Sequence, residues 1–152
     1  MKEFRFIADH MLGKLARWLR LMGYDVLYPS PAMCDDDIAW LADKEHRILL
    51  TRDRVLAGRA RGAILVESDM LEEQLAELKN RIGLSLELEL SRCSVCNAPI
   101  ELVDHGFARN KVPEKILIAF DEFWYCRRCR KFYWYGSHVE NMQLRIRNAN
   151  RD

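Results

Sequence analysis

Carboxylates follow the apolar stretches of this chain at several points. Asp9, Asp53 and Asp69 each come just after a short apolar run, and three aspartates occupy residues 35–37 at the start of a stretch with helical spacing. Clustered carboxylates repel one another unless a cation neutralises them. Their hard oxygen atoms favour Mg²⁺ or Mn²⁺, ions that activate water and stabilise the leaving oxygen in phosphodiester hydrolysis. If the aspartates meet in the fold, they indicate metal-dependent hydrolysis of a phosphate ester.

The elements that must position these aspartates are strands and helices in alternation. Apolar, strand-forming runs occupy residues 4–7, 24–28, 47–51 and 63–67. Helical spacing of apolar residues follows over residues 11–22, 38–42 and 71–82. Gly23 stands where a glycine typically ends a helix. The alternation predicts a three-layer α/β domain with a mainly parallel sheet, whose strands end at a common edge where the aspartates are expected to converge.

A second interpretation of each aspartate is structural. Aspartate is among the best N-cap residues, so Asp9, Asp53 and Asp69 could each only cap the helix or turn that follows. Residues 35–37 could be a solvated helix start that the helix dipole favours. The placement of all of them at one sheet edge favours a shared site.

Basic residues accompany two of the aspartates. Lys14 and Arg17 lie three apart on the polar side of the first helix, and Arg52 precedes Asp53. We expect these three cations to hold substrate phosphates. The chain has no GxxxxGK[ST] or GxGxxG motif, and none of its four histidines stands in a nucleophile motif. Nucleotide-binding folds of those types and Ser-His-Asp or Cys-His hydrolases are therefore unsupported.

Four of the five cysteines form two CxxC pairs, Cys93 with Cys96 and Cys126 with Cys129. Each pair can present two thiolates to one tetrahedral Zn²⁺, and four thiolates leave no open position for water, so the predicted zinc is structural. The alternative is a dithiol redox pair, which normally stands alone at a helix start. The long separation of the two pairs predicts a hairpin or loop between them.

The second cysteine pair stands in a basic, aromatic segment. Residues 126–152 carry seven Lys or Arg against two acids, a balance of +5 in a chain whose net charge of +1 predicts no general affinity for polyanions. Seven aromatic residues lie within 123–135. Aromatic platforms with cations bind single-stranded nucleic acid, although most of these rings could instead form the core of a small zinc module. The expected RNA-binding residues beside Arg52 are Arg127, Arg128, Arg130 and Lys131. His138 is either an RNA contact or a buried, hydrogen-bonded imidazole.

Two domains are expected, an α/β domain over residues 1–90 and a small zinc-binding domain over 91–152. Strict alternation of apolar and polar residues predicts a half-buried strand over 84–90, just before this boundary. Beyond the boundary the helical spacing of apolar residues ends. With 49% hydrophobic residues the chain should fold as a globule, and no apolar run approaches the roughly 18 residues that span a bilayer. Without a signal peptide's apolar core, a cytoplasmic location is expected.

Four segments together resemble a known family, the Mut-seven C-terminal ribonuclease domain. They are ADHMLGKLARWLRLMGYDV (8–26), RILLTRDRVL (47–56), RCSVCN (92–97) and CRRCRKFYWYGSH (126–138). The resemblance implies a PIN-like nuclease fold with a C-terminal zinc ribbon and metal-dependent cleavage of RNA. It matches Asp9 and Asp53 to the family's acidic positions and Lys14 and Arg17 to phosphate contacts. The helix-borne acid is Asp35, which fits the pattern best, or Asp36.

The leading hypothesis is a ribonuclease in which Asp9, Asp35 or Asp36, and Asp53 hold Mg²⁺ or Mn²⁺ and the zinc ribbon helps to bind RNA. The alternative is a non-catalytic RNA-binding or ribosome-associated module. A third hypothesis is a metal-dependent phosphatase that does not act on nucleic acid. The oligomeric state is left open, and no membrane partner is expected.

Overall fold

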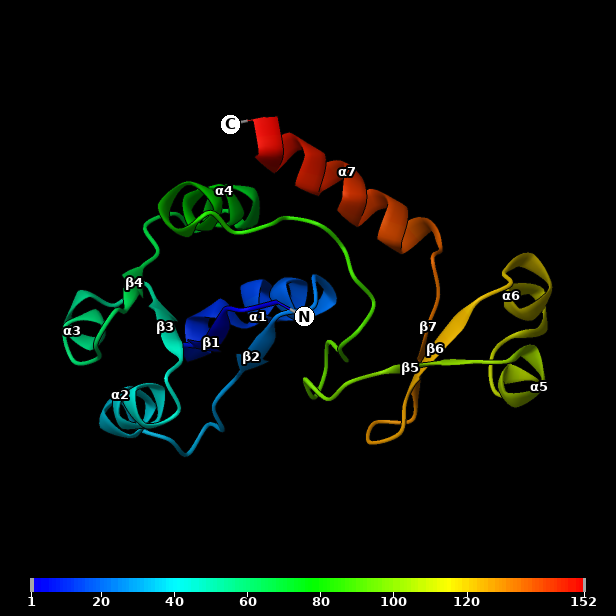
Figure 1. The fold of residues 1–152 in the computed structure, drawn as a ribbon, viewed down its shortest axis with the longest axis horizontal. Helices are drawn as coiled ribbons and strands as arrows, with labels where there is room; N and C mark the ends of the chain where they lie inside the picture. Colours follow the sequence, from blue (N-terminus) through cyan, green and yellow to red (C-terminus); the bar gives the residue numbers. More distant parts are fainter. Residues whose placement is uncertain (1, 152) are drawn as a thin grey trace.

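Two sheets organise the computed structural model, which describes residues 2–151 (Figure 1). The first sheet is fully parallel, with strand order β2-β1-β3-β4. Its strands are β1 (Arg5–Ala8), β2 (Asp25–Leu27), β3 (Ile48–Thr51) and β4 (Ile64–Leu65). The predicted three-layer α/β architecture with a mainly parallel sheet is therefore confirmed.

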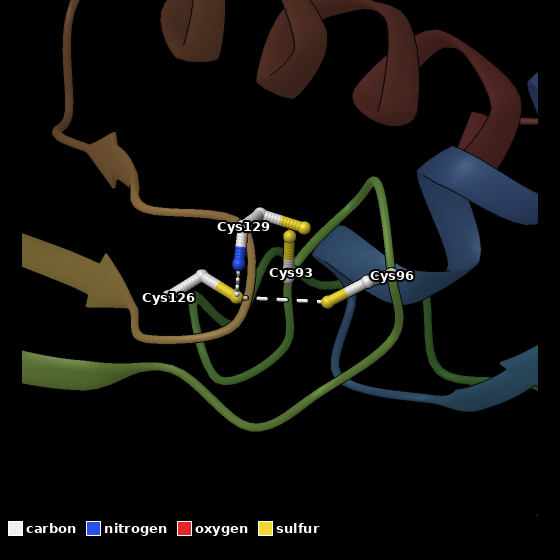
Figure 2. A group of neighbouring side chains, drawn as sticks. All are labelled: Cys93, Cys96, Cys126 and Cys129. Carbon is white, nitrogen blue, oxygen red and sulfur yellow. Dashed lines mark hydrogen bonds between the residues drawn. The ribbon is translucent and has the colours of Figure 1, made fainter.

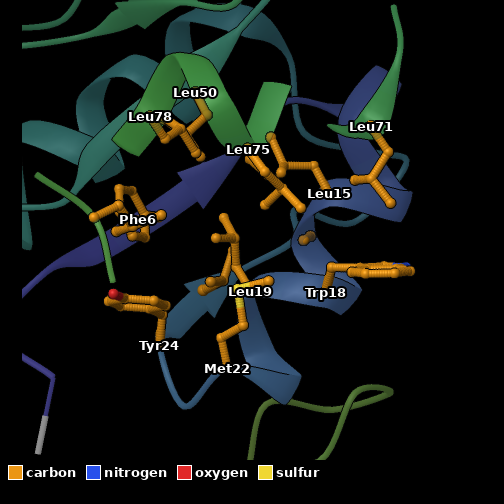
Figure 3. Packing of buried hydrophobic residues seen from close by; sticks show 14 of the residues in the cluster. Phe6, Leu15, Trp18, Leu19, Met22, Tyr24, Leu50, Leu71, Leu75 and Leu78 are labelled. Atoms are coloured by element: carbon orange, nitrogen blue, oxygen red, sulfur yellow. The ribbon is translucent and has the colours of Figure 1, made fainter. Parts of the chain in front are cut away.

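Helices cover both faces of the parallel sheet. One face carries α1 (Gly13–Leu21), which follows the short 3₁₀ turn η1 (His10–Leu12), and α4 (Leu71–Ile82); the other carries α2 (Asp35–Lys44) and α3 (Arg54–Ala57). Successive side chains of a strand point to opposite faces. Phe6 of β1 therefore joins the core under α1 and α4, whereas Ile7 joins the core under α2. Figure 3 shows the larger of these two cores.

Gly23 ends the first helix as predicted. Its N–H donates to the carbonyl of Arg20 at 2.9 Å, and its φ of +92° lies in the region that favours glycine. A side chain at this position would also collide with the carboxylate of Glu89. The glycine lets the chain reverse from α1 into β2.

The prediction of a strand over residues 84–90 is wrong. The segment is extended, and its leucines do alternate, with Leu84, Leu86 and Leu90 buried. However, it joins neither sheet. It is attached through single hydrogen bonds instead, from the N–H of Glu89 to Leu21 at 2.9 Å and from the Tyr24 hydroxyl to the carbonyl of Ser85 at 2.8 Å. The alternation reflects burial against α1 and its neighbours rather than strand pairing.

The second sheet is antiparallel, with order β5-β6-β7. Its strands are β5 (Glu101–Val103), β6 (Phe123–Cys126) and β7 (Lys131–Tyr133). The chain between the two cysteine pairs is more structured than the predicted hairpin or loop. It forms β5 and two short helices, α5 (His105–Ala108) and α6 (Glu114–Ala119).

A long C-terminal helix, α7 (Ser137–Arg151), runs from the second sheet back over the parallel-sheet unit to α4 (Figure 1). Helical periodicity therefore does not end at residue 91, contrary to expectation. Met142, Ile146 and Ala149 of α7 join the core formed by α1 and α4. Arg145 forms an ion pair with Glu72 of α4 at 2.5 Å. Residues from both predicted domains thus share one core, and the division after residue 90 stays a prediction.

Candidate functional site

Asp9 is a buried carboxylate at the carboxyl end of β1. Its side chain is 6% exposed, and its Oδ2 accepts a hydrogen bond of 2.7 Å from the Thr51 hydroxyl at the end of β3. Asp9 makes no side-chain cap to η1, so the alternative N-cap interpretation is wrong for this residue. Within residues 2–151, Oδ1 of Asp9 has no hydrogen-bond partner and remains available to a ligand.

Asp53 is connected to Asp9 through the same threonine. The N–H of Asp53 donates to the Thr51 hydroxyl oxygen at 3.0 Å, so this hydroxyl connects the ends of β1 and β3. Oδ1 of Asp53 caps α3 by accepting from the N–H groups of Val55 and Leu56 at 2.8 and 3.2 Å. Asp53 is therefore an N-cap, as the structural interpretation required, but the cap uses only one of its two carboxylate oxygens.

The triple aspartate forms the first turn of α2, where each residue has a different environment. Asp36 pairs with Arg59 at 2.7 Å, and Oδ2 of Asp37 accepts from the backbone N–H of Cys34 at 3.4 Å. Asp35 is exposed and has no partner within the described part of the chain. Because α2 connects β2 to β3, its first turn lies at the edge where the strands end. Of the two candidates for the helix-borne acid, Asp35 is the one left free to bind a ligand.

The structure thus connects Asp9 to the backbone of Asp53 through the Thr51 hydroxyl and places Asp35 at the same edge. It does not gather these three carboxylates tightly. Among the described residues, one group of three or more potential ligands is close enough to share a metal ion. That group consists of the four paired cysteines. Asp69 lies outside the linked pair, beside Lys14 in a small pocket at the start of α4.

The predicted phosphate-binding cations are all exposed. Lys14 lies in the first turn of α1, and its charge helps to lower the pKa of Glu72 on α4, which the Arg145 guanidinium lowers most. Arg17 follows one turn later on the same helix face. Arg52 stands between Thr51 and Asp53. All three lie on elements that begin or end at the carboxylate edge.

The four paired cysteines converge as the spacing predicted. Figure 2 shows their side chains pointing toward one another. Cys93 and Cys96 come from the loop before β5, Cys126 from the end of β6 and Cys129 from the turn after it. All four sulfur atoms lie within 4.8 Å of one another, and Sγ of Cys96 and Cys126 are 3.6 Å apart. Tetrahedral zinc with Zn–S bonds of about 2.3 Å separates its sulfurs by roughly 3.8 Å. The donor set therefore fits a structural Zn²⁺.

Neighbouring groups shift the pKa values of the Cys93 and Cys129 thiols. The closeness of Cys96 raises the pKa of Cys129 to about 12. Burial acts to raise the pKa of Cys93 as well, but hydrogen bonds from the Tyr133 hydroxyl, 3.1 Å from its sulfur, and from backbone groups lower it to about 7. Four thiolates at this spacing repel one another, and a bound divalent cation removes that cost.

Two buried polar residues that the sequence analysis missed attach the first cysteine loop to the parallel-sheet unit. Arg20 of α1 is 6% exposed and donates to the carbonyls of Val26, Ser94 and Val95 at 2.9 to 3.1 Å. Oδ1 of Asn97 accepts from the N–H of Val26 on β2 at 3.0 Å. Except for the bond of Arg20 to Val26, each of these contacts joins residues more than 70 positions apart in the sequence. No sequence motif marks them for that reason.

The turn between β6 and β7 displays the predicted basic residues on the surface. Arg127, Arg128, Arg130 and Lys131 are all exposed, and Arg127 forms an ion pair with Glu101. The aromatic residues divide between the two interpretations. Phe123 and Tyr133 are buried core residues, whereas Tyr135 is 40% exposed. His138 is exposed at the start of α7, so its interpretation as a buried imidazole is wrong.

Comparison with known proteins gives one match. The model of the family described as the Mut7-C RNAse domain matches residues 4–146, nearly the whole chain, and confirms the resemblance drawn from the sequence. No curated protein and no solved structure matches. No helix within residues 2–151 has both the length and the apolar character needed to cross a bilayer.

Proposed function

The chain belongs to the Mut7-C RNAse domain family, and from this membership we propose that it is a metal-dependent ribonuclease acting at the carboxylate edge of the parallel sheet. The observation that carries the proposal is the link between Asp9 and Asp53. The Thr51 hydroxyl donates to the buried carboxylate of Asp9, which keeps one free oxygen, and accepts from the backbone N–H of Asp53, so it holds the two strand ends together.

Asp9, Asp53 and Asp35 would hold Mg²⁺ or Mn²⁺, because each keeps at least one carboxylate oxygen without a protein partner in the described chain and all three are hard oxygen ligands. Such an ion supplies the activation of water and the neutralisation of charge that phosphodiester hydrolysis needs. Asp36 is engaged by Arg59, so its role in this proposal is to fix the first turn of α2.

The basic residues have separate roles in the proposed reaction. Lys14 and Arg17 on α1 and Arg52 after β3 bind the phosphates on either side of the scissile bond and orient it toward the carboxylates. Hydrolysis adds water across one P–O bond and leaves a phosphate monoester and a free hydroxyl. Because the cations make no bond to the attacking oxygen, their proposed contribution is orientation and affinity.

The zinc ribbon is proposed to bind the RNA strand. Arg128 and Arg130 have no ion-pair partner in the part of the chain that the structure describes, so their charges are available to phosphates, and Lys131 adjoins them. The exposure of this basic turn is also the observation that favours the alternative of a non-catalytic RNA-binding module.

A cleavage assay on the zinc-loaded protein tests the function. Labelled single-stranded and hairpin RNA are incubated with Mn²⁺, with Mg²⁺, and without either ion, omitting strong chelators that would also remove zinc. We expect cleavage only when Mn²⁺ or Mg²⁺ is present. Binding of RNA in a gel-shift assay without cleavage under any condition would support the binding module. Neither binding nor cleavage of RNA, with hydrolysis of a small phosphomonoester, would support the phosphatase hypothesis.

A further inference from the structure

A pocket lies where the zinc ribbon meets the parallel-sheet unit, away from the carboxylate edge. Its walls come from the C-terminal end of α1, the extended segment at Leu88 and Leu90, strand β7 and the first turn of α7. Its volume is about 340 Å³. Pockets that take small organic groups usually measure about 300–1,000 Å³, so this one suits a single ring system rather than a large ligand.

The chemistry of the walls is specific. Three aromatic residues, Phe132, Tyr133 and Trp134, line the pocket together with leucines. Its polar groups include Lys131, Ser137 and His138. No aspartate or glutamate is among the residues that line it. A largely apolar pocket with aromatic walls, a cation and no acidic side chain fits an aromatic ring that carries a phosphate.

Trp134 is held in place before any ligand arrives. Its ring packs edge-on against Phe123, with ring centroids 6.1 Å apart. A Cβ atom on Gly136 would lie only 2.9 Å from Nε1 of the indole, so the glycine allows the ring to lie close to the backbone. The indole is therefore fixed in position as a stacking surface.

Helix α1 connects this pocket to the carboxylate edge. Lys14, Arg17 and Leu21 are spaced three and four residues apart and so share one helix face. Lys14 lies in the first turn of the helix, five residues after Asp9 in the chain, and Leu21 lines the pocket at the end of the helix. At about 1.5 Å per residue, the two ends of this stripe are roughly 10 Å apart. A short single strand following the two cations reaches both sites.

We infer that this pocket takes an unpaired nucleobase of single-stranded RNA, with Lys131 contacting the adjoining phosphate. The inference rests on the proposed function, since it names the form of RNA that the nuclease accepts. Charge complementarity selects this occupant, because the exposed Arg128 and Arg130 lie on the turn that leads directly into Lys131 at the start of β7. Bases stack on aromatic side chains irrespective of sequence, so the pocket selects unpaired RNA rather than one sequence.

Tryptophan fluorescence tests the inference without requiring cleavage. The full, zinc-loaded chain carrying Asp9→Asn is titrated with a short oligoadenylate and, separately, with inorganic polyphosphate. We expect the oligoadenylate to quench the fluorescence and polyphosphate to leave it nearly unchanged. The quenching should disappear in Trp134→Phe and persist in Trp40→Phe, which alters an exposed indole on α2.

Filling the pocket provides the matched comparison. Ser137→Phe places a ring at the pocket wall, and Asn141→Phe places the same ring on α7 outside the pocket. Ser137→Phe should weaken oligoadenylate binding about tenfold or more, since stacking contributes that much affinity per base, and should leave polyphosphate binding unchanged. Asn141→Phe should leave both unchanged.

The outcomes separate this inference from the proposed function. The base-binding role of the pocket would be overturned if wild type and Ser137→Phe had equal affinity for oligoadenylate, or if polyphosphate quenched the fluorescence as strongly as oligoadenylate. Neither result would contradict metal-dependent cleavage. RNA that occupies the pocket but is never cleaved by the chain with Asp9 intact would overturn the nuclease and leave the pocket standing. If Ser137→Phe fails to bind zinc or to fold, the Trp134→Phe and Trp40→Phe pair decides.

Discussion

The side-chain amide of Asn97 donates a hydrogen bond of 2.7 Å to the carboxylate of Asp25, which places the first zinc loop directly on the edge strand of the parallel sheet. Oδ1 of the same amide accepts from the N–H of Val26. The loop therefore occupies part of the open edge of β2. Together with the hydrogen bonds from Arg20 to the carbonyls of Ser94 and Val95, these bonds join the cysteine loop to the parallel-sheet unit.

Replacing Asn97 should destabilise the protein through this contact. Asn97 has a φ of +71°, which glycine adopts freely and alanine does not. Asn97→Gly should lower the free energy of unfolding by about 1–3 kcal/mol, because it leaves the N–H of Val26 without its partner. Asn97→Ala should cost more, since it adds backbone strain. Denaturant unfolding of both variants measures the difference, and an Asn97→Gly protein as stable as wild type would contradict the role of the contact.

The Asp25 carboxylate should make stability depend on pH in acid. Burial alone would raise its pKa, but hydrogen bonds from Arg47 and Asn97 outweigh that and lower it to about 2. A carboxylate with a lowered pKa stabilises the fold above its ordinary value near 4, and this stabilisation is lost as the pH falls toward 2. Asp25→Asn should therefore cost about 2 kcal/mol at pH 7 and little at pH 2. Denaturant unfolding of both proteins at each pH measures the difference in their free energies of unfolding. The same difference at pH 7 and at pH 2 would contradict this role of Asp25.

Removal of zinc should increase hydrogen exchange at β2. Without the metal, the four thiols no longer fix the loop that carries Asn97, and the N–H of Val26 should lose protection from hydrogen exchange. The amides of β3, which lies in the interior of the sheet, should keep most of theirs. Hydrogen-exchange mass spectrometry before and after chelation measures both. Unchanged exchange at β2 would show that the loop stays docked without zinc.

Local patterns were sufficient to predict the parallel-sheet unit. The change from strand to helix spacing after residue 7 and the glycine at 23 are signals carried within a few residues, and the structure follows them. The cysteine pairs predicted a metal site for the same reason, because two ligands of each pair lie within one turn of chain. The expectation of a shared carboxylate edge came from the parallel topology alone, and it stays a prediction because the structure does not gather Asp9, Asp53 and Asp35 tightly.

The errors arose where long-range packing decides the structure. The leucines over residues 84–90 alternate, but hydrogen bonds to Leu21 and Tyr24, rather than a neighbouring strand, hold the segment. The apolar face of α7 is narrow, with Met142, Ile146 and Ala149 spread among charged residues. Thr51 escaped notice because its partner Asp9 lies 42 residues away. A hydroxyl residue at the end of β3, next to the end of β1 in a parallel sheet, is the signal from which this contact could have been predicted.

Thr51 offers a test of how Asp9 is positioned. Thr51→Val keeps the shape of the side chain but removes the hydroxyl that donates to Asp9 and accepts from the N–H of Asp53. We expect RNA cleavage and Mn²⁺ affinity to fall about 10- to 100-fold, as is usual when a residue that orients a metal ligand is lost. Thr51→Ser, which retains the hydroxyl, should restore most of both. A Thr51→Val protein with wild-type Mn²⁺ affinity would remove the threonine from the account.

The most direct test of the nuclease is the cleavage rate of Asp9→Asn compared with Asp121→Asn, an exposed aspartate on the zinc ribbon. Both changes remove one negative charge and keep the size of the side chain. With saturating Mn²⁺ and the same single-stranded RNA, Asp9→Asn should bind the RNA but cleave it at least about 100-fold more slowly than wild type, because a neutral amide is a poor ligand for the ion. Asp121→Asn should cleave at the wild-type rate. Cleavage by Asp9→Asn at the rate of Asp121→Asn would show that the carboxylate edge is not the active site.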